Sequence, residues 1–190
     1  MSDGKILAFY APYTGAGKST AAGILNDGES IILSFADPLY YCAESLIPDL
    51  SSGDDKSNPR NELGGKSLRE FLIYFGQAGR EFYQNIWSER MRRVINKLKG
   101  TFNIIIDDLR FPNEFAMLRE EGAKIVRITN PDREIIEPKI GTLVEGHKII
   151  VCKTEGLLEE YTFDYELVNY KRSIEEYKAQ LAEMMRELWP

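Results

Sequence analysis

Residues that bind transition metals or form disulfides are scarce in this chain of 190 residues, which has one histidine and two cysteines. His147 has no cluster of further ligands around it, and Cys42 and Cys152 lie far apart without a CxxC spacing. A structural zinc site takes about four such ligands at short, regular spacings. We therefore expect neither a zinc site nor a disulfide framework.

Long apolar runs and an excess of basic residues are lacking as well. The apolar run near the N-terminus covers only residues 6–10, which is too short for a membrane span or a signal sequence. A cytoplasmic protein without a membrane partner is therefore expected. The 24 Lys and Arg residues are outnumbered by 30 Asp and Glu, which gives a net charge of −6. Because nucleic-acid binding needs a broad basic face, we expect no nucleic-acid partner.

Short apolar runs alternate with helical patterns along the whole chain. Strands are expected at residues 5–11, 31–35, 103–106, 124–128 and 165–169. Helices are expected from residue 18 to a glycine cap at 26–28, after the capping residue Ser67, across 87–98, between 107 and 124, and after the capping residue Ser173. This alternation predicts one α/β domain over residues 1–190, with a parallel sheet covered by helices.

Two stretches lack such a pattern. Residues 49–66 are polar and rich in Ser, Gly, Asp and Asn, which is typical of a mobile loop. Residues 130–160 are rich in Pro, Gly and charges, with a hairpin expected around residues 144–147. This second excursion is a candidate lid.

The residues Gly17-Lys18-Ser19, between the first strand and the first helix, match the C-terminal half of a P-loop. Pro12 stands where the first glycine of that pattern is expected, but Gly15 and Gly17 still allow backbone amides to approach a phosphate. Lys18 would bridge the β- and γ-phosphates of ATP, and Ser19 would hold Mg²⁺. The predicted ATP-binding residues are Thr14, Gly15, Ala16, Gly17, Lys18, Ser19 and Thr20. The alternative is an ordinary glycine-rich turn between a strand and a helix.

Charged residues follow the third predicted strand, at the end where parallel sheets bind ligands. Asp107 lies where a second Mg²⁺ ligand is expected, and Asp107 and Asp108 would point to opposite sides if the strand continued that far. Asp108 and Arg110, two residues apart, could face one common site. The alternative is that Arg110 and Glu114 form a solvated ion pair at a helix start.

An anionic acceptor would need a cationic clamp of its own. Arg69 and Arg80 are eleven residues apart, close to three helical turns, and so can share one face of a helix. The alternative is that they only solvate the helix. Any of the nearby aromatic residues could stack on a base, and the alternative is that most of them fill the core. These residues are Tyr74, Phe75, Phe82, Tyr83 and Trp87.

Taken together, these segments resemble the deoxynucleoside monophosphate kinases of tailed bacteriophages over nearly the full length. The resemblance rests on the P-loop, residues 34–39 (Ser-Phe-Ala-Asp-Pro-Leu), residues 68–72 and 75–80 with Trp87, residues 107–114, residues 154–155 and residues 163–169. It implies a P-loop core with an acceptor-binding insertion at about residues 36–100 and a small lid at about 130–160. It also implies transfer of the γ-phosphoryl group of ATP, with Mg²⁺, to a deoxynucleoside 5′-monophosphate.

The family's roles then transfer to individual residues of this chain. The catalytic residues would be Lys18, Arg80, Asp108 and Arg110, and the metal residues Ser19 and Asp107. The acceptor would be bound by Asp37, Arg69, Gln77, Arg80, Trp87, Asp108, Arg110 and Glu114. The partner would be a small-molecule substrate, with a homodimer as a further expectation and the host cytoplasm as the location if a phage encodes the chain.

Some residues depart from the family's pattern. Relatives carry Lys where this chain has Tyr40, and the spacing from Gln77 to Arg80 is shorter than in many of them. In the excursion, Arg133 and Lys139 are candidates to cover the transferring phosphoryl group. Two other functions stay open from the residues alone. One is a P-loop kinase for another small acceptor such as dephospho-coenzyme A, and the other is an ATP-binding switch module.

Overall fold

The computed structural model describes residues 4–13, 15–47, 50, 56, 58–131, 156–170 and 173–190. In chain order the elements are β1 (Ile6–Tyr10), α1 (Lys18–Leu25), β2 (Ser30–Leu33), α2 (Asp37–Leu46), β3 (Pro59–Arg60), the 3₁₀ turn η1 (Asn61–Leu63), β4 (Lys66–Ser67), α3 (Leu68–Phe82), α4 (Ile86–Leu98), β5 (Asn103–Leu109), α5 (Pro112–Glu120), β6 (Lys124–Thr129), β7 (Tyr165–Val168) and α6 (Ile174–Leu188). No helix in these ranges is long and apolar enough to cross a membrane.

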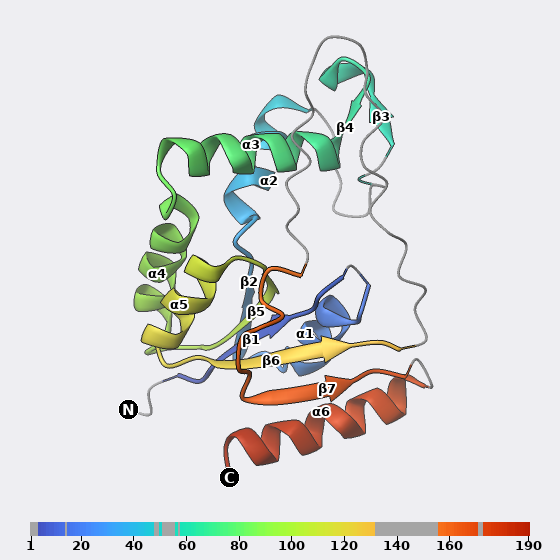
Figure 1. Ribbon diagram of the computed structural model, residues 1–190, viewed down its shortest axis with the longest axis vertical. Coiled ribbons are helices and arrows are strands. Elements are labelled where there is room, and N and C mark those ends of the chain that lie inside the picture. Colours follow the sequence, from blue (N-terminus) through green and yellow to red (C-terminus); the bar gives the residue numbers. More distant parts are fainter. Residues whose placement is uncertain are drawn as a thin grey trace.

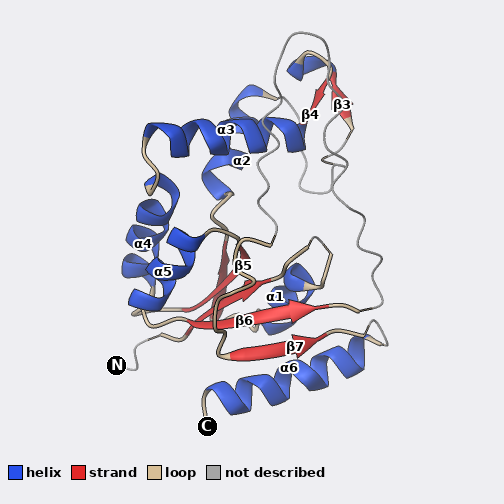
Figure 2. Cartoon of the chain, viewed as in Figure 1, coloured by secondary structure: helices blue, strands red, loops and turns tan. Residues whose placement is uncertain are grey.

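Five strands form one parallel sheet in the order β2-β5-β1-β6-β7 (Figure 1). Helices α4 and α5 lie on one side of this sheet, and α6 runs along β7 on the other, with α1 beside it (Figure 2). The prediction of an α/β fold with a parallel, helix-covered sheet is confirmed. The central strands β1 and β5 end where the loops that carry the site begin.

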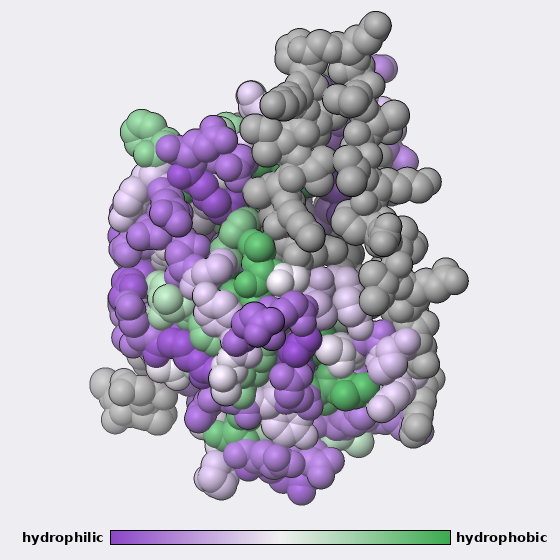
Figure 3. All heavy atoms as spheres, in the orientation of Figure 1, coloured by the Kyte–Doolittle hydropathy of each residue, from purple (hydrophilic) through white to green (hydrophobic). Residues whose placement is uncertain are grey.

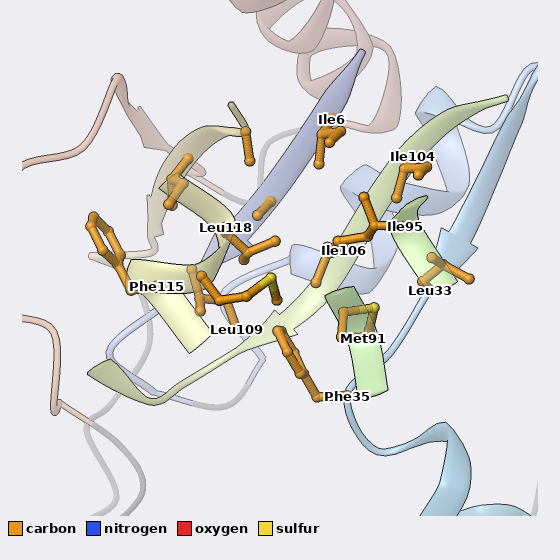
Figure 4. Close-up of a cluster of buried hydrophobic side chains, with 14 of the residues drawn as sticks. Ile6, Leu33, Phe35, Met91, Ile95, Ile104, Ile106, Leu109, Phe115 and Leu118 are labelled. Atoms are coloured by element: carbon orange, nitrogen blue, oxygen red, sulfur yellow. The ribbon is translucent and has the colours of Figure 1, made fainter. Parts of the chain in front are cut away.

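The side chains of β1 alternate between two hydrophobic layers, as the pleat of a strand requires. Ile6, Ala8 and Tyr10 face the layer that contains Met91 of α4, Leu118 of α5 and their neighbours (Figure 4). The opposite layer contains Leu7 and Phe9 of β1 with buried residues of α1 and α6. Figure 3, in the orientation of Figure 1, shows that the described outer surface on the side turned to the viewer is mainly hydrophilic, with small apolar areas. Burial of both faces explains why the strands read as continuous apolar runs.

Helices α2 and α3, with the short β3–β4 hairpin, project from the end of the sheet (Figure 1). Their own core is small, with Ala43, Ile47 and Leu68 as its buried members. Ser67 begins α3 with a complete capping box, in which its hydroxyl accepts from Glu70 N–H at 3.2 Å and Glu70 accepts from Ser67 N–H at 2.8 Å. The capping box predicted at Ser67 is therefore confirmed, and so is the Ser173 cap of α6, whose hydroxyl accepts from Glu176 N–H at 3.1 Å.

Several predicted element bounds are wrong. Strand β2 ends at Leu33 and not at residue 35, whereas β5 runs on to Leu109, past residue 106. The prediction had two helices between β2 and β5 and missed a third, α2. Pro38, in the first turn of α2, is a helix-start signal that could have identified it. Part of the polar stretch 49–66 is also ordered as β3, η1 and β4. Gly28 lies two residues past the α1 cap, Asn26, and so does not cap that helix.

Candidate functional site

The loop between β1 and α1 has the backbone of a phosphate cradle. Gly15 and Gly17 have φ angles of 80° and 113°, in the left-handed region that glycine adopts without strain. Gly17 is the N-cap residue of α1, so Lys18, Ser19 and Thr20 form the first turn of the helix. Backbone N–H groups at a helix start attract anions. Thr14 lies outside the described residues, and the other six predicted ATP-binding residues lie in this loop or in the first turn of α1.

Tyr13 connects the N-terminal part of this loop to Asn130, just after β6. Its hydroxyl donates to the Asn130 carbonyl at 2.8 Å and accepts from the Asn130 N–H at 2.6 Å. Pro12 precedes it with a fixed φ, in the place of the missing glycine. The entry to the loop is therefore held by a side chain that belongs to the loop itself.

Two hydrogen-bond donors from the C-terminal part of the chain hold the C-terminal part of the loop, at Ala16 and Gly17. The Asn169 side-chain amide donates to the Ala16 carbonyl at 2.9 Å, and the Tyr177 hydroxyl donates to the Gly17 carbonyl at 3.2 Å. A Cβ at Gly17 would lie 2.5 Å from Asn169 Nδ2. A hollow of about 240 Å³ lies beside these anchors, lined in part by Ser173 and Gln180.

Ser19 and Asp107 meet across the interface of α1 and β5. The Ser19 hydroxyl donates to Asp107 Oδ2 at 3.0 Å. Burial raises the pKa of Asp107 above its usual range, and the charge of Asp108 raises it further, while the Ser19 bond and Lys18 act in the other direction. The carboxylate thus lies in a partly desolvated place where a cation would be stabilising.

Strand β5 contains a bulge at the two aspartates. Ala8 pairs with Ile106 and Tyr10 pairs with Leu109, so Asp107 and Asp108 together stand opposite the single residue Phe9. This extra residue gives the neighbouring carboxylates different partners.

Asp108 fixes the turn between β2 and α2. It accepts hydrogen bonds from Phe35 N–H at 2.9 Å, from Ala36 N–H at 3.1 Å and from the Ser34 hydroxyl. Asp37, the first residue of α2, accepts from Ser34 N–H at 3.0 Å, and burial raises its pKa. The acidic residue pair across this turn therefore builds a rigid corner next to the P-loop.

Glu114, in the first turn of α5, is buried and pairs with the partly exposed Arg80 of α3. The Glu114 side chain is 2% exposed, accepts from Arg110 N–H at 3.0 Å and Phe111 N–H at 3.1 Å, and lies 3.6 Å from the Arg80 guanidinium. Arg80 also stacks over the Phe111 ring, 3.8 Å from its centroid. Burial, with a smaller contribution from Asp108, raises the pKa of Glu114 to about 7. The alternative of a solvated Arg110–Glu114 pair is wrong, because Glu114 is buried and its charged partner is Arg80.

The other predicted acceptor residues lie on or beside α3. Gln77 donates to Glu81 at 3.3 Å, one turn along the helix, and Trp87 donates its indole N–H to the Gly76 carbonyl at 2.9 Å. Arg69 is exposed at the start of α3, about 16 Å from Arg80 along the helix axis. The two arginines share a face, but they are too far apart to hold one phosphate. Arg110 is exposed just after β5.

The aromatic residues of this region do not fill the core, contrary to the prediction. Tyr74 is 80% exposed and Phe82 is 89% exposed, and Phe75 and Tyr83 are exposed as well. Trp87 is half-buried and packs on Gly79, where a Cβ would lie 2.4 Å from its ring. Because α3 buries few residues against α2 and α4, most of its surface faces outward.

The donor set at Ser19 and Asp107 fits Mg²⁺ and no soft metal. Both residues offer oxygen, and Mg²⁺ is commonly held by one or two carboxylates together with phosphates and water. Within the described ranges, no group of three or more His, Cys, Asp or Glu side chains could hold a metal ion by itself. A metal here would therefore need the phosphates of a ligand to complete its coordination.

The sequence did not point to every residue of the site. Ser34 and Asn169 were part of the resemblance without a role of their own, and Tyr13, Asn130 and Tyr177 were likewise given no role. Their contacts are to backbone atoms far away in the chain, for which a sequence motif gives no signal. The lid candidates Arg133 and Lys139, together with the hairpin expected at 144–147, lie outside the described residues.

The fold and the loop define an α/β protein of the P-loop type. No protein-family model matches the chain. By sequence it is 29% identical, over 135 residues that make up 62% of this chain and 70% of the other, to a protein of Acanthamoeba polyphaga mimivirus named "Putative deoxynucleotide monophosphate kinase". This relative supports a P-loop kinase-like protein. It comes from a giant virus, so the bacteriophage type stays a prediction.

Two solved structures are similar over nearly the whole chain. The Mycobacterium tuberculosis APS kinase, in a Cys556Ala mutant, has a TM-score of 0.45 and 15% identity, and covers 97% of this chain and 98% of its own. The Deinococcus radiodurans tunicamycin resistance protein has a TM-score of 0.47 and 13% identity, and covers 96% and 95%. At these scores the likeness supports no inference about substrate or activity.

Proposed function

We propose that the chain is an ATP-dependent kinase that phosphorylates a deoxynucleoside 5′-monophosphate. The observation that carries the proposal is that the neighbouring residues Asp107 and Asp108 bind two different segments of the chain. One carboxylate holds Ser19 of the P-loop, and the other holds the β2–α2 turn. A donor loop and a second rigid corner thus meet at one edge of the sheet, where parallel sheets bind ligands. The name of the mimivirus relative points to the same acceptor class.

On the donor side, the amides of the loop and Lys18 would bind the phosphates of ATP, and Ser19 and Asp107 would hold Mg²⁺. When bound, the metal ion neutralises negative charge on the β- and γ-phosphates. Asp107 has a raised pKa through burial, so a bound cation would favour its ionised form. Lys18 would stabilise the charge that builds up as the γ-phosphoryl group leaves.

On the acceptor side, Arg80 and Arg110 would bind the monophosphate of the acceptor. Arg80 is held in place by Glu114 and the Phe111 ring, whereas Arg110 is exposed and follows the bulged strand directly. An oxygen of the acceptor phosphate attacks the γ-phosphorus, and the bond from that phosphorus to the β–γ bridging oxygen breaks. Because the attacking phosphate is already ionised, alignment and charge stabilisation suffice without a general base.

The acceptor class is tested by measuring ADP release with ATP and one candidate acceptor at a time. The candidates are the four common deoxynucleoside monophosphates, their ribonucleotide counterparts and dephospho-coenzyme A. We expect release that depends on a deoxynucleoside monophosphate. Release only with dephospho-coenzyme A would identify another small acceptor, and release independent of any acceptor would identify an ATP-hydrolysing module; both results contradict the proposal.

A further inference from the structure

We propose that Asn169 and Tyr177 are positioning residues that set the orientation of the phosphate-binding amides in the P-loop. Both come from the C-terminal part of the chain, one just after β7 and one in α6. They donate to consecutive carbonyls of the loop, those of Ala16 at 2.9 Å and Gly17 at 3.2 Å. The inference rests on the proposed function only in requiring that this loop binds phosphate.

The planarity of the peptide bond converts a held carbonyl into a directed amide. In a trans peptide the C=O of one residue and the N–H of the next lie in one plane and point in opposite directions. Within the described chain no peptide bond is cis. Holding the Ala16 and Gly17 carbonyls against Asn169 and Tyr177 therefore turns the N–H groups of Gly17 and Lys18 to the other side. These N–H groups are the donors that a P-loop offers to phosphates.

The loop needs such anchors because glycine leaves its peptides free to rotate. Gly17 has a φ of 113°, and Gly15 has a φ of 80°, so the loop has access to backbone states that other residues avoid. A loop that samples several amide orientations must lose that freedom when it binds a ligand, and an anchored loop has lost it beforehand. The close fit confirms how tightly the anchors pack, since a Cβ at Gly17 would lie 3.1 Å from the Tyr177 hydroxyl.

The Tyr177 hydroxyl is a dependable donor at this position. Tyr177 is 4% exposed, and burial raises its pKa above the usual range, so the hydroxyl keeps its proton at neutral pH. The Gly17 carbonyl accepts a second hydrogen bond from Ala21 N–H at 2.9 Å, the first bond of α1. Tyr177 therefore ties the loop and the start of α1 to α6 at a single oxygen.

The test measures binding of inorganic tripolyphosphate with Mg²⁺ by calorimetry, so that contacts to a base do not contribute. Asn169→Asp places a carboxylate oxygen against the Ala16 carbonyl oxygen and should weaken binding about 10- to 100-fold, because the donor is replaced by an anionic acceptor that the carbonyl dipole repels. Tyr177→Phe deletes one hydroxyl and should weaken binding about three- to tenfold. Lys18→Ala should bind weakest. Gln180→Glu is the matched control, since Gln180 lines the same hollow but donates its hydrogen bond to the Val168 carbonyl of β7, at 3.3 Å.

A purely structural role would lower the thermal unfolding midpoint without a specific effect on the donor. We expect Tyr177→Phe to raise the KM for ATP by the same factor as the tripolyphosphate Kd and to leave the KM for the acceptor unchanged. If Asn169→Asp does not fold, Tyr177→Phe alone decides. Wild-type binding by the folded anchor variants, next to a loss in Lys18→Ala, would overturn the anchors and leave the proposed function standing. Binding with the expected losses but no phosphoryl transfer would overturn the kinase and keep the anchors. A wild-type chain that does not bind tripolyphosphate would overturn both.

Discussion

The P-loop and the α2–α3 arm are held in very different ways. The loop is fixed by hydrogen bonds from three directions, through Tyr13, through Asp107 and through the anchors Asn169 and Tyr177. The α2–α3 arm rests on a small core of its own, and α3 contributes only Leu68 and Gly76 as buried residues. Stability against local opening follows burial and hydrogen bonding. We therefore expect a donor side that is formed in advance and an acceptor side that adapts to its ligand.

The strongest way to break this comparison is to remove one charge from each side. Arg110→Ala should lower kcat/KM for the deoxynucleoside monophosphate about 100-fold, the cost of losing a charged hydrogen bond of about 1.5–3 kcal/mol, while the affinity for ATP stays unchanged. Steady-state kinetics and ATP titration measure both. Lys18→Ala should instead impair transfer to every acceptor alike.

Arg93 supplies the matched control for Arg110. It is also an exposed arginine, and its Nε donates to the Glu89 carbonyl at 3.1 Å, within α4. Arg93→Ala should keep wild-type kinetics. Equal losses in ATP affinity and acceptor turnover for Arg110→Ala would mean that the two sides are not separate.

The buried carboxyl of Glu114 gives the acceptor side a dependence on pH. Its pKa is raised to about 7 by burial, so the folded chain holds a proton that the unfolded chain releases near pH 4.5. This contribution to stability is fully present below pH 4.5 and is lost as the pH rises through 7, and its complete loss costs about 3 kcal/mol. Denaturant unfolding at pH 5 and pH 8 should therefore show Glu114→Gln gaining stability relative to the wild type at the higher pH.

The control for Glu114 is Glu62, an exposed glutamate in η1. Glu62→Gln should leave the pH dependence of unfolding as it is in the wild type. A Glu114→Gln variant with the wild-type pH dependence would show that the Arg80 pair keeps Glu114 ionised.

Two helical glycines sharpen the comparison with a smaller effect. A Cβ at Gly79 would lie 2.4 Å from the Trp87 ring, so Gly79→Ala should force α3 and α4 apart and lower the free energy of unfolding by about 1–3 kcal/mol. Gly79→Ala should also raise the KM for the acceptor and spare ATP binding, and an unchanged acceptor KM would argue against a role for the α3–α4 joint.

In α1, a Cβ at Gly23 would meet no atom within 4 Å, so Gly23→Ala should raise the free energy of unfolding by up to about 1 kcal/mol through helix propensity. Chemical denaturation measures both changes.

The fold was largely readable from the sequence because its signals are local. Continuous apolar runs predicted the parallel strands, and Ser67 and Ser173 marked the starts of α3 and α6. The end of β2 was misjudged because Asp108 binds the turn that follows this strand. The end of β5 was misjudged because a bulge lets this strand continue past its two aspartates. Neither effect is visible in the composition of a strand.

The site was predictable only where one short motif carries it. Gly17-Lys18-Ser19 identified the loop, and Asp107 was assigned its place beside Ser19. The anchors could not be found in this way, because Asn169 and Tyr177 bond to carbonyls 153 and 160 residues away. Backbone carbonyls carry no residue identity, so a sequence pattern cannot encode such a pair. The exposed aromatic residues of α3 were misjudged because the spacing of apolar residues does not show how little of this helix is covered by neighbouring elements.

The bulge in β5 would set the distance between the two halves of the proposed reaction. Asp107 and Asp108 are joined by a single peptide unit, so the loop that carries the donor and the corner that faces the acceptor cannot drift apart by more than that covalent link allows. Without the extra residue opposite Phe9, one carboxylate would return to the hydrophobic layer beneath it. In the proposed kinase, one inserted residue would therefore fix the length of the gap that the phosphoryl group has to cross.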